Sequence, residues 1–78
     1  MHEVVFDASG QIAQARFKGV LVVRGTRIQI LHDVYEVEAI ARTGKIALLA
    51  EDPRRSFSIT PHMLLHLIED RHAKWLAD

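Results

Sequence analysis

The chain has 78 residues, equal numbers of acidic and basic residues, and no cysteine. Its length predicts one domain spanning residues 1–78, which buries little surface and so favours a partner, a metal or very good packing. The lack of cysteine excludes disulfides and thiolate metal sites. The zero net charge argues against a protein that coats nucleic acid.

Several function classes lack their usual sequence signals. There is no apolar run long enough to cross a bilayer, and Met1-His2-Glu3-Val4 lacks the basic stretch and long apolar core of a signal peptide. Nucleophile elbows and glycine-rich phosphate loops are also missing. We therefore expect a non-enzymatic cytoplasmic protein with no cofactor and no membrane contact.

Turn signals divide the first 59 residues at short intervals. Asp7–Gly10 fits a type I hairpin turn, and Gly25-Thr26 and Thr43-Gly44 place glycine where hairpin turns need it. Asp52–Arg55 has proline at the second position of a further turn, where its fixed φ is already correct. Gly19 has no turn residue beside it, and we interpret it as a bend or bulge within one long strand.

The segments between these turns alternate apolar and polar residues, as half-buried strands do. Val20–Val23 and Ile46–Ala50 are apolar on both faces and are predicted to be central or covered on both sides. Short connections favour antiparallel neighbours in chain order. The predicted fold is α+β: a curled antiparallel meander of five or six strands over residues 1–59, partly closed into a small barrel, with a helix packed on it.

That helix is predicted over residues 60–77, with Thr60 as its N-cap and Pro61 in its first turn. Its apolar residues spread over roughly 220° of a helix of about 100° per residue. A helix that covers one sheet needs a narrower apolar stripe. We therefore expect the helix to meet a second surface through the following apolar residues: Met63, Leu64, Leu65, Leu67, Ile68, Trp75 and Leu76.

The leading functional hypothesis is an interaction module that forms a homo-oligomer, most simply a dimer, through this helix. Aromatic residues beside an apolar helix face are typical of interface cores. The alternative is that Trp75 only completes the core of its own chain. The predicted contact residues are Leu64, Ile68, His72, Trp75 and Leu76.

The second hypothesis is a nucleic-acid-binding accessory protein. Alternate turns of a meander lie at the same end, which would bring Arg24 and Arg27 together with Arg42 and Lys45 as a phosphate-facing patch. The alternative is that these residues are ordinary charged turn residues that aid solubility and bind no ligand. Exposed aromatics for base stacking are not expected, because all the phenylalanines and the tyrosine fall on inward phases of their strands.

The third hypothesis is a metal site at His62 and His66, which stand four residues apart on one helix face. Asp70 or Glu69 would supply another ligand one turn later. The plain alternative is a solvated face on which His66 and Asp70 form an ordinary helical pair.

A pattern of strand types over about two thirds of the chain resembles the small SH3-like β-barrel segments of phage Mu and Tn7-class transposases. The residues that carry it are Arg24–Ile28, Tyr35–Val37, Lys45–Leu49, Ser58–Thr60 and Leu64-Leu65. The resemblance implies a free-standing accessory module, associated with a mobile genetic element. The catalytic carboxylates of these transposases belong to another domain that has no counterpart here. The resemblance therefore assigns no functional residue to this chain.

Overall fold

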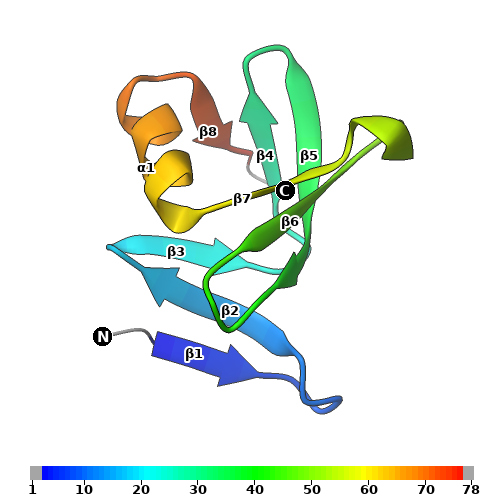
Figure 1. The fold of residues 1–78 in the computed structure, drawn as a ribbon, viewed down its shortest axis with the longest axis vertical. Coiled ribbons are helices and arrows are strands. Elements are labelled where there is room, and N and C mark those ends of the chain that lie inside the picture. The colour runs from blue at the N-terminus through cyan, green and yellow to red at the C-terminus, as the bar shows by residue number, and fades with distance from the viewer. Residues whose placement is uncertain (1–2, 77–78) are drawn as a thin grey trace.

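The computed structural model describes residues 3–76 and has an α+β fold with two antiparallel sheets and one α-helix. Residues 1, 2, 77 and 78 lie outside the described part; they include the start of the segment examined for a signal peptide and the end of the predicted helix. The first sheet has the order β1-β2-β3 (Figure 1), formed by β1 (Glu3–Phe6), β2 (Ile12–Phe17) and β3 (Val20–Val23).

The second sheet has five strands in the order β7-β6-β5-β4-β8. A 3-10 turn, η1 (Pro53–Arg55), and the helix α1 (Pro61–Glu69) lie between its strands in the chain. The two sheets do not close into a barrel. The strands are β4 (Arg27–Ile30), β5 (Asp33–Ile40), β6 (Ile46–Ala50), β7 (Phe57–Ile59) and β8 (Ala73–Trp75).

Two predicted hairpin turns are confirmed. The Gly10 N–H donates to the Asp7 carbonyl at 3.1 Å, and the Gly44 N–H donates to the Ala41 carbonyl at 2.9 Å. Gly44 has a positive φ of 95°, and a Cβ there would lie 3.1 Å from Cγ of Pro61. Glycine is therefore required at this turn for its backbone angle and for the close approach of the first residue of α1.

Two other glycines do not act as predicted. Lys18 and Gly19, both with positive φ, form a two-residue hairpin turn that pairs Phe17 with Val20, so Gly19 is not a bend within one strand. Gly25 does not close a hairpin either. Its N–H donates to the Val37 carbonyl of the second sheet at 2.8 Å. Gly25 therefore lies at the crossover where the chain passes from the first sheet to the second. Sequence spacing alone does not distinguish such a crossover from a hairpin.

One apolar core lies between the two sheets and α1, and no polar or charged residue of the described chain is buried in it. The predicted alternation fails in β5, where the register shifts between Val37 and Ala39. This bulge turns Ala39 outward and buries Ile40. The fully buried core residues with the largest side chains are Phe17, Ile28, Ile46, Leu48, Leu64, Val22 and Val37.

The two strands that are apolar on both faces are not covered on both sides. Leu21 of β3 is 40% exposed and Leu49 of β6 is 37% exposed. β6 is an inner strand of its sheet, whereas β3 is an edge. Both strands therefore bury one face only and present leucine to solvent on the other.

The start of α1 is as predicted: the Thr60 hydroxyl accepts from the Met63 N–H at 3.2 Å, and Pro61 is in the first turn. The end is not. The helix stops at Glu69, because His72 N–H bonds to the Leu67 carbonyl while Arg71 takes a left-handed φ of 63°. This is a Schellman ending with arginine where glycine is usual.

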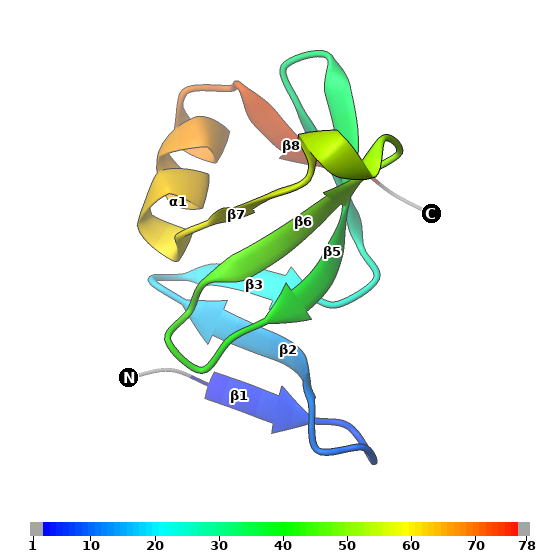
Figure 2. The same cartoon turned by 45° about the vertical axis from the view of Figure 1, so that its right-hand side comes forward.

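The chain after that ending forms β8, which pairs with β4 in the register Ile28 with Trp75 and Ile30 with Ala73. The predicted helix over residues 60–77 is therefore wrong from residue 70 onward within the described part. Trp75 and Leu76 do not belong to the helix. The wide apolar arc of the sequence is a shorter helix followed by a strand, seen in both views above β3 (Figures 1 and 2).

Candidate functional site

A hollow of about 510 Å³ lies where the two sheets fail to join. Its walls come from β3 on one side and from α1 and β8 on the other. We call it the seam groove and define it by the apolar residues Leu21, Val23, Leu65, Ile68 and Trp75. Its volume is in the range of sites that bind small ligands or several side chains of a peptide.

A second hollow of about 560 Å³ follows β8 and shares Ile68 and Trp75 with the seam groove. We call it the β8 hollow; besides the shared pair it is lined by Gln29, Leu31, Arg71, His72, Ala73 and Lys74. The two hollows therefore meet at the Ile68–Trp75 pair. The hollows are adjacent, and we call the two together the concave region.

β3 borders the seam groove with an unpaired edge. The Arg24 N–H donates to the Ala13 carbonyl at 2.8 Å, which fixes the alternation of hydrogen-bonded pairs along β2 and β3. By that alternation, Leu21 and Val23 direct their backbone groups away from β2. The Val23 carbonyl accepts from Thr26. The Leu21 N–H, the Leu21 carbonyl and the Val23 N–H have no partner strand among residues 3–76.

The charges around the two hollows have one sign. Arg16 lines the seam groove, and Arg71 and Lys74 line the β8 hollow, while no carboxylate residue lines either. Arg16 contacts Glu3 at 3.5 Å. Arg71 and Lys74 form no ion pair within residues 3–76. The concave region is thus apolar in its centre and cationic at its rim.

Backbone strain is concentrated at the same rim. Within residues 3–76 the non-glycine residues with positive φ are Lys18, Leu31 and Arg71. Leu31 and Arg71 line the β8 hollow, and Lys18 precedes Gly19, which lines the seam groove. The left-handed conformation costs about 1–2 kcal/mol for such residues. Strained positions of this kind often mark binding sites, because the fold retains them at a cost to stability.

The structure brings together part of the predicted contact set. Ile68 and Trp75 line both hollows, and the exposed His72 lines the β8 hollow. Leu76 is half-buried and donates its N–H to the Arg27 carbonyl at 2.9 Å. Leu64 has no exposed surface and packs in the protein's own core, so it is not available to a partner.

Sequence reasoning did not identify the contribution of β3. The sequence around Leu21 and Val23 predicts an ordinary buried strand. Only the order of the strands in the sheets shows that these residues lie opposite α1. The one available signal was the run of apolar residues on both faces of that strand. That run predicts a central strand, whereas β3 is an edge that borders a groove.

The four predicted nucleic-acid residues do not form one patch. Arg24 and Arg42 line a hollow of about 230 Å³. Lys45 is exposed in the β5–β6 turn beside Arg42. Arg27 lines a different hollow, on the outer face of the five-stranded sheet, together with Glu36. The separation follows from the crossover at Gly25, which places the two arginines that flank it on different sheets.

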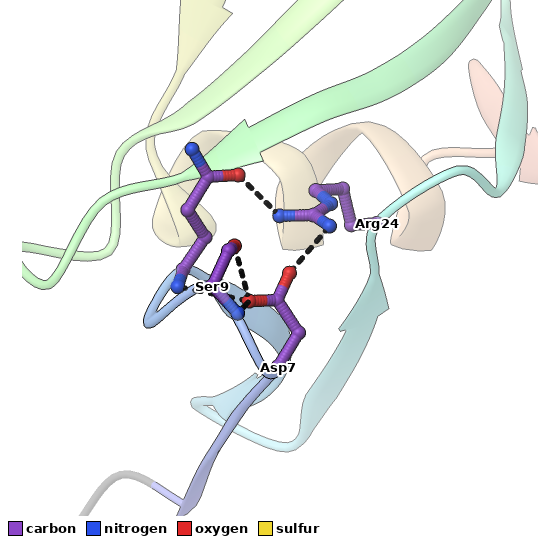
Figure 3. Close-up of polar contacts among 4 residues, drawn as sticks. Asp7, Ser9 and Arg24 are labelled. Carbon is purple, nitrogen blue, oxygen red and sulfur yellow. Dashed lines mark hydrogen bonds and ion pairs between the residues drawn. The ribbon is translucent and has the colours of Figure 1, made fainter.

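Arg24 is also neutralised by Asp7 (Figure 3). Its guanidinium donates to Asp7 Oδ2 at 2.6 Å and to the Gln11 side chain at 2.7 Å. The other oxygen of Asp7 accepts from the Ser9 hydroxyl at 2.6 Å and from two backbone N–H groups. These donors, led by the Ser9 hydroxyl, lower the pKa of Asp7 to about 2 from 3.8. We call these four residues the Asp7 cluster.

Phe6 lies outward, contrary to prediction, because it follows a register shift at the end of β1. Its side chain is 47% exposed, and the guanidinium carbon of Arg42 lies 5.2 Å from its ring centroid. This is a cation–π contact on an exposed ring. Phe57 is also partly exposed, and its ring meets Tyr35 edge to face at 5.2 Å.

His62 and His66 lie side by side, with ring centroids 4.6 Å apart at an interplanar angle of 84°. Both are exposed on α1. Within residues 3–76 no group of three or more histidine, cysteine or carboxylate residues is placed to hold a metal ion. Asp70 caps the end of the helix and donates its N–H to the His66 carbonyl. The third ligand that the hypothesis requires is thus not assembled.

Comparisons of the chain with protein-family models, with curated proteins and with solved structures find no match. The resemblance to transposase barrel segments therefore stays a prediction from strand pattern. Separately, none of the helices in residues 3–76 has the length and apolar character needed to span a bilayer.

Proposed function

We propose that this protein is a non-enzymatic interaction module that binds another polypeptide at the seam groove. The observation that carries the proposal is the meeting of an unpaired strand edge with the apolar wall of Leu65, Ile68 and Trp75. An exposed apolar edge strand is a template for pairing with another chain. Pairing at this edge would also take the two sheets toward the partly closed barrel expected from the sequence.

A homodimer is one form of this proposal and has a direct test. Trp75 is the only tryptophan of the chain and lines the groove, so its emission reports what occupies the site. If a second copy fills the groove, Trp75 emission shifts to shorter wavelength as concentration rises through the micromolar range. The mass measured by light scattering doubles over the same range.

Binding of other polypeptides is tested with a displayed library of random peptides of about ten residues, longer than a typical strand. The library is selected on the wild type and on two matched variants, Leu21→Gln and Leu49→Gln. Both leucines are similarly exposed strand residues, and only Leu21 lines the groove. We expect Leu21→Gln to weaken the selected peptides about tenfold and Leu49→Gln to leave them unchanged. A monomer at all concentrations that enriches no peptide would contradict the proposed function.

A second candidate, single-stranded nucleic-acid binding, is supported by the exposed Phe6 ring with Arg42 beside it and Lys45 in the same turn as Arg42. An exposed aromatic next to a cation is the pairing that stacks bases near phosphates. We expect salt-sensitive binding of a labelled oligothymidine that Phe6→Ala weakens about tenfold. Val5→Ala, on the same strand and also exposed, is the control. Equal loss in both variants, or no binding at low salt, removes this candidate.

A further inference from the structure

Resting on the function proposed above, we propose that the natural occupant of the seam groove is an extended acidic segment of another protein, which adds a strand to β3. The segment carries apolar residues that face α1, and aspartate or glutamate where it reaches Arg71 and Lys74. This names the chemistry of the partner and the geometry of its binding, neither of which follows from a groove alone.

The strand geometry follows from the free backbone groups of β3. The Leu21 N–H and carbonyl and the Val23 N–H stand at the unpaired edge that borders the groove. An added strand satisfies them with main-chain hydrogen bonds, and the pockets beside it then select its alternate side chains. No bulge, proline or charged residue within β3 protects this edge from such pairing.

The side chains of an added strand meet two different surroundings, because successive residues of a strand point to opposite faces. One set faces α1, where Leu65, Ile68 and Trp75 form an apolar wall, so apolar residues suit it. The other set lies beside Leu21, whose cross-strand partner Arg16 is already paired with Glu3. Carboxylates are therefore expected at the end of the segment that reaches Arg71 and Lys74 in the adjacent hollow.

The acidic character follows from the charge of the rim. Arg71 and Lys74 line the β8 hollow without an ion pair among residues 3–76, and no carboxylate residue lines either hollow. An acidic partner neutralises these cations, and their attraction increases the rate at which it associates. Arg71 holds a strained left-handed φ of 63° where glycine would fit without cost, so a cation is kept there against backbone preference.

The same charges disfavour a second copy of this chain as the occupant. A two-fold dimer buries the same patch of both subunits against itself. Arg71 and Lys74 would then enter one interface with their own counterparts, without carboxylate residues in the lining to offset them. Like charges placed together oppose association.

The test is the composition of the peptides selected on the wild type, followed by binding of the best one, labelled with fluorescein. We expect enrichment of acidic residues at one end of the peptides, beside apolar residues at alternate positions. Arg71→Gly should weaken binding about fivefold to tenfold without loss of folding, since glycine accepts that backbone angle. Arg42→Gly, at a cation that lines neither of these two hollows, is the charge-matched control.

Strand addition is tested at Leu21 itself. Leu21→Pro removes only the outward N–H, which the β2–β3 ladder does not use, whereas Leu21→Val keeps it. We expect the proline variant to abolish binding of the selected peptide and the valine variant to retain it. In the wild type, the amide proton shifts caused by binding should be largest at residues 21 and 23. The amide spectrum of the proline variant shows whether that variant is folded.

Distinct results overturn this inference and the proposed function. Peptides that bind at the groove but show no acidic preference overturn the acidic strand while leaving an interaction module. A Trp75 emission shift that accompanies doubling of mass likewise replaces the acidic partner with a second copy. Failure of both peptide selection and self-association overturns the proposed function itself.

Discussion

The Asp7 cluster and the rim of the seam groove both hold an arginine at a turn, and the surroundings of the two arginines differ. Arg24 donates to Asp7 and Gln11, with its charge matched at 2.6 Å. Arg71 has no such partner among residues 3–76 and sits in a strained conformation. The first arginine holds the β1–β2 turn against the end of β3, within the first sheet. The second is exposed beside an apolar groove, which is where a binding residue is expected.

The largest expected effect tests where the groove ends and the core begins. Leu64 is fully buried one residue away from the groove residue Leu65, so Leu64→Ala should lower the free energy of unfolding by about 3 kcal/mol. Met63→Ala, on an exposed side chain, should change it by less than about 0.5 kcal/mol. Denaturant unfolding measures both. A small effect of Leu64→Ala would place that residue on the interaction surface instead.

The next effect concerns pH. The folded pKa of Asp7 is about 2, below the ordinary 3.8, so its contribution to stability is complete above about pH 4. That contribution is lost as the pH falls from about 4 to about 2. We expect Asp7→Asn to lower the melting temperature at pH 7 and to remove this part of the acid sensitivity. Glu51→Gln, at an exposed carboxylate, is the control and should keep the wild-type pH profile.

A smaller effect, of opposite sign, belongs to the rim. Arg71→Gly relieves the left-handed strain, partly offset by the greater freedom of glycine in the unfolded chain, and should raise stability by up to about 1 kcal/mol. Arg71→Ala keeps the strain and removes the charge, and should not stabilise. Thermal unfolding distinguishes the two. A loss of stability in Arg71→Gly would mean that this arginine is structural, as Arg24 is.

The sequence predicted those parts of the fold that depend on local signals. Thr60-Pro61 marked the helix start, and Asp7–Gly10 and Thr43-Gly44 marked two hairpins. The helix end was missed because a left-handed arginine gives no compositional signal, unlike glycine. The outward turn of Ala39 was missed because a bulge depends on the partner strand. Non-local pairing decides such features.

The candidate site was predictable to a similar extent. Ile68 and Trp75 were expected to contact a partner, and both line the groove. However, Ile68 lies on α1 and Trp75 on β8, because the helix predicted to contain both residues ends at Glu69. The opposite wall, Leu21 and Val23, required the order of the strands. Strand order depends on how distant segments pair, and the spacing of residues along the chain does not encode it directly.

The pairing of β8 with β4 has a consequence for the order of folding. It joins segments farther apart in the chain than any other strand pair of residues 3–76. Closing so long a loop costs more entropy than forming the hairpins, so this pairing should come after them. Substitutions in β8 should then speed unfolding and hardly slow refolding, which stopped-flow emission of Trp75 would reveal. The groove would be the last part of the molecule to form and the first to open.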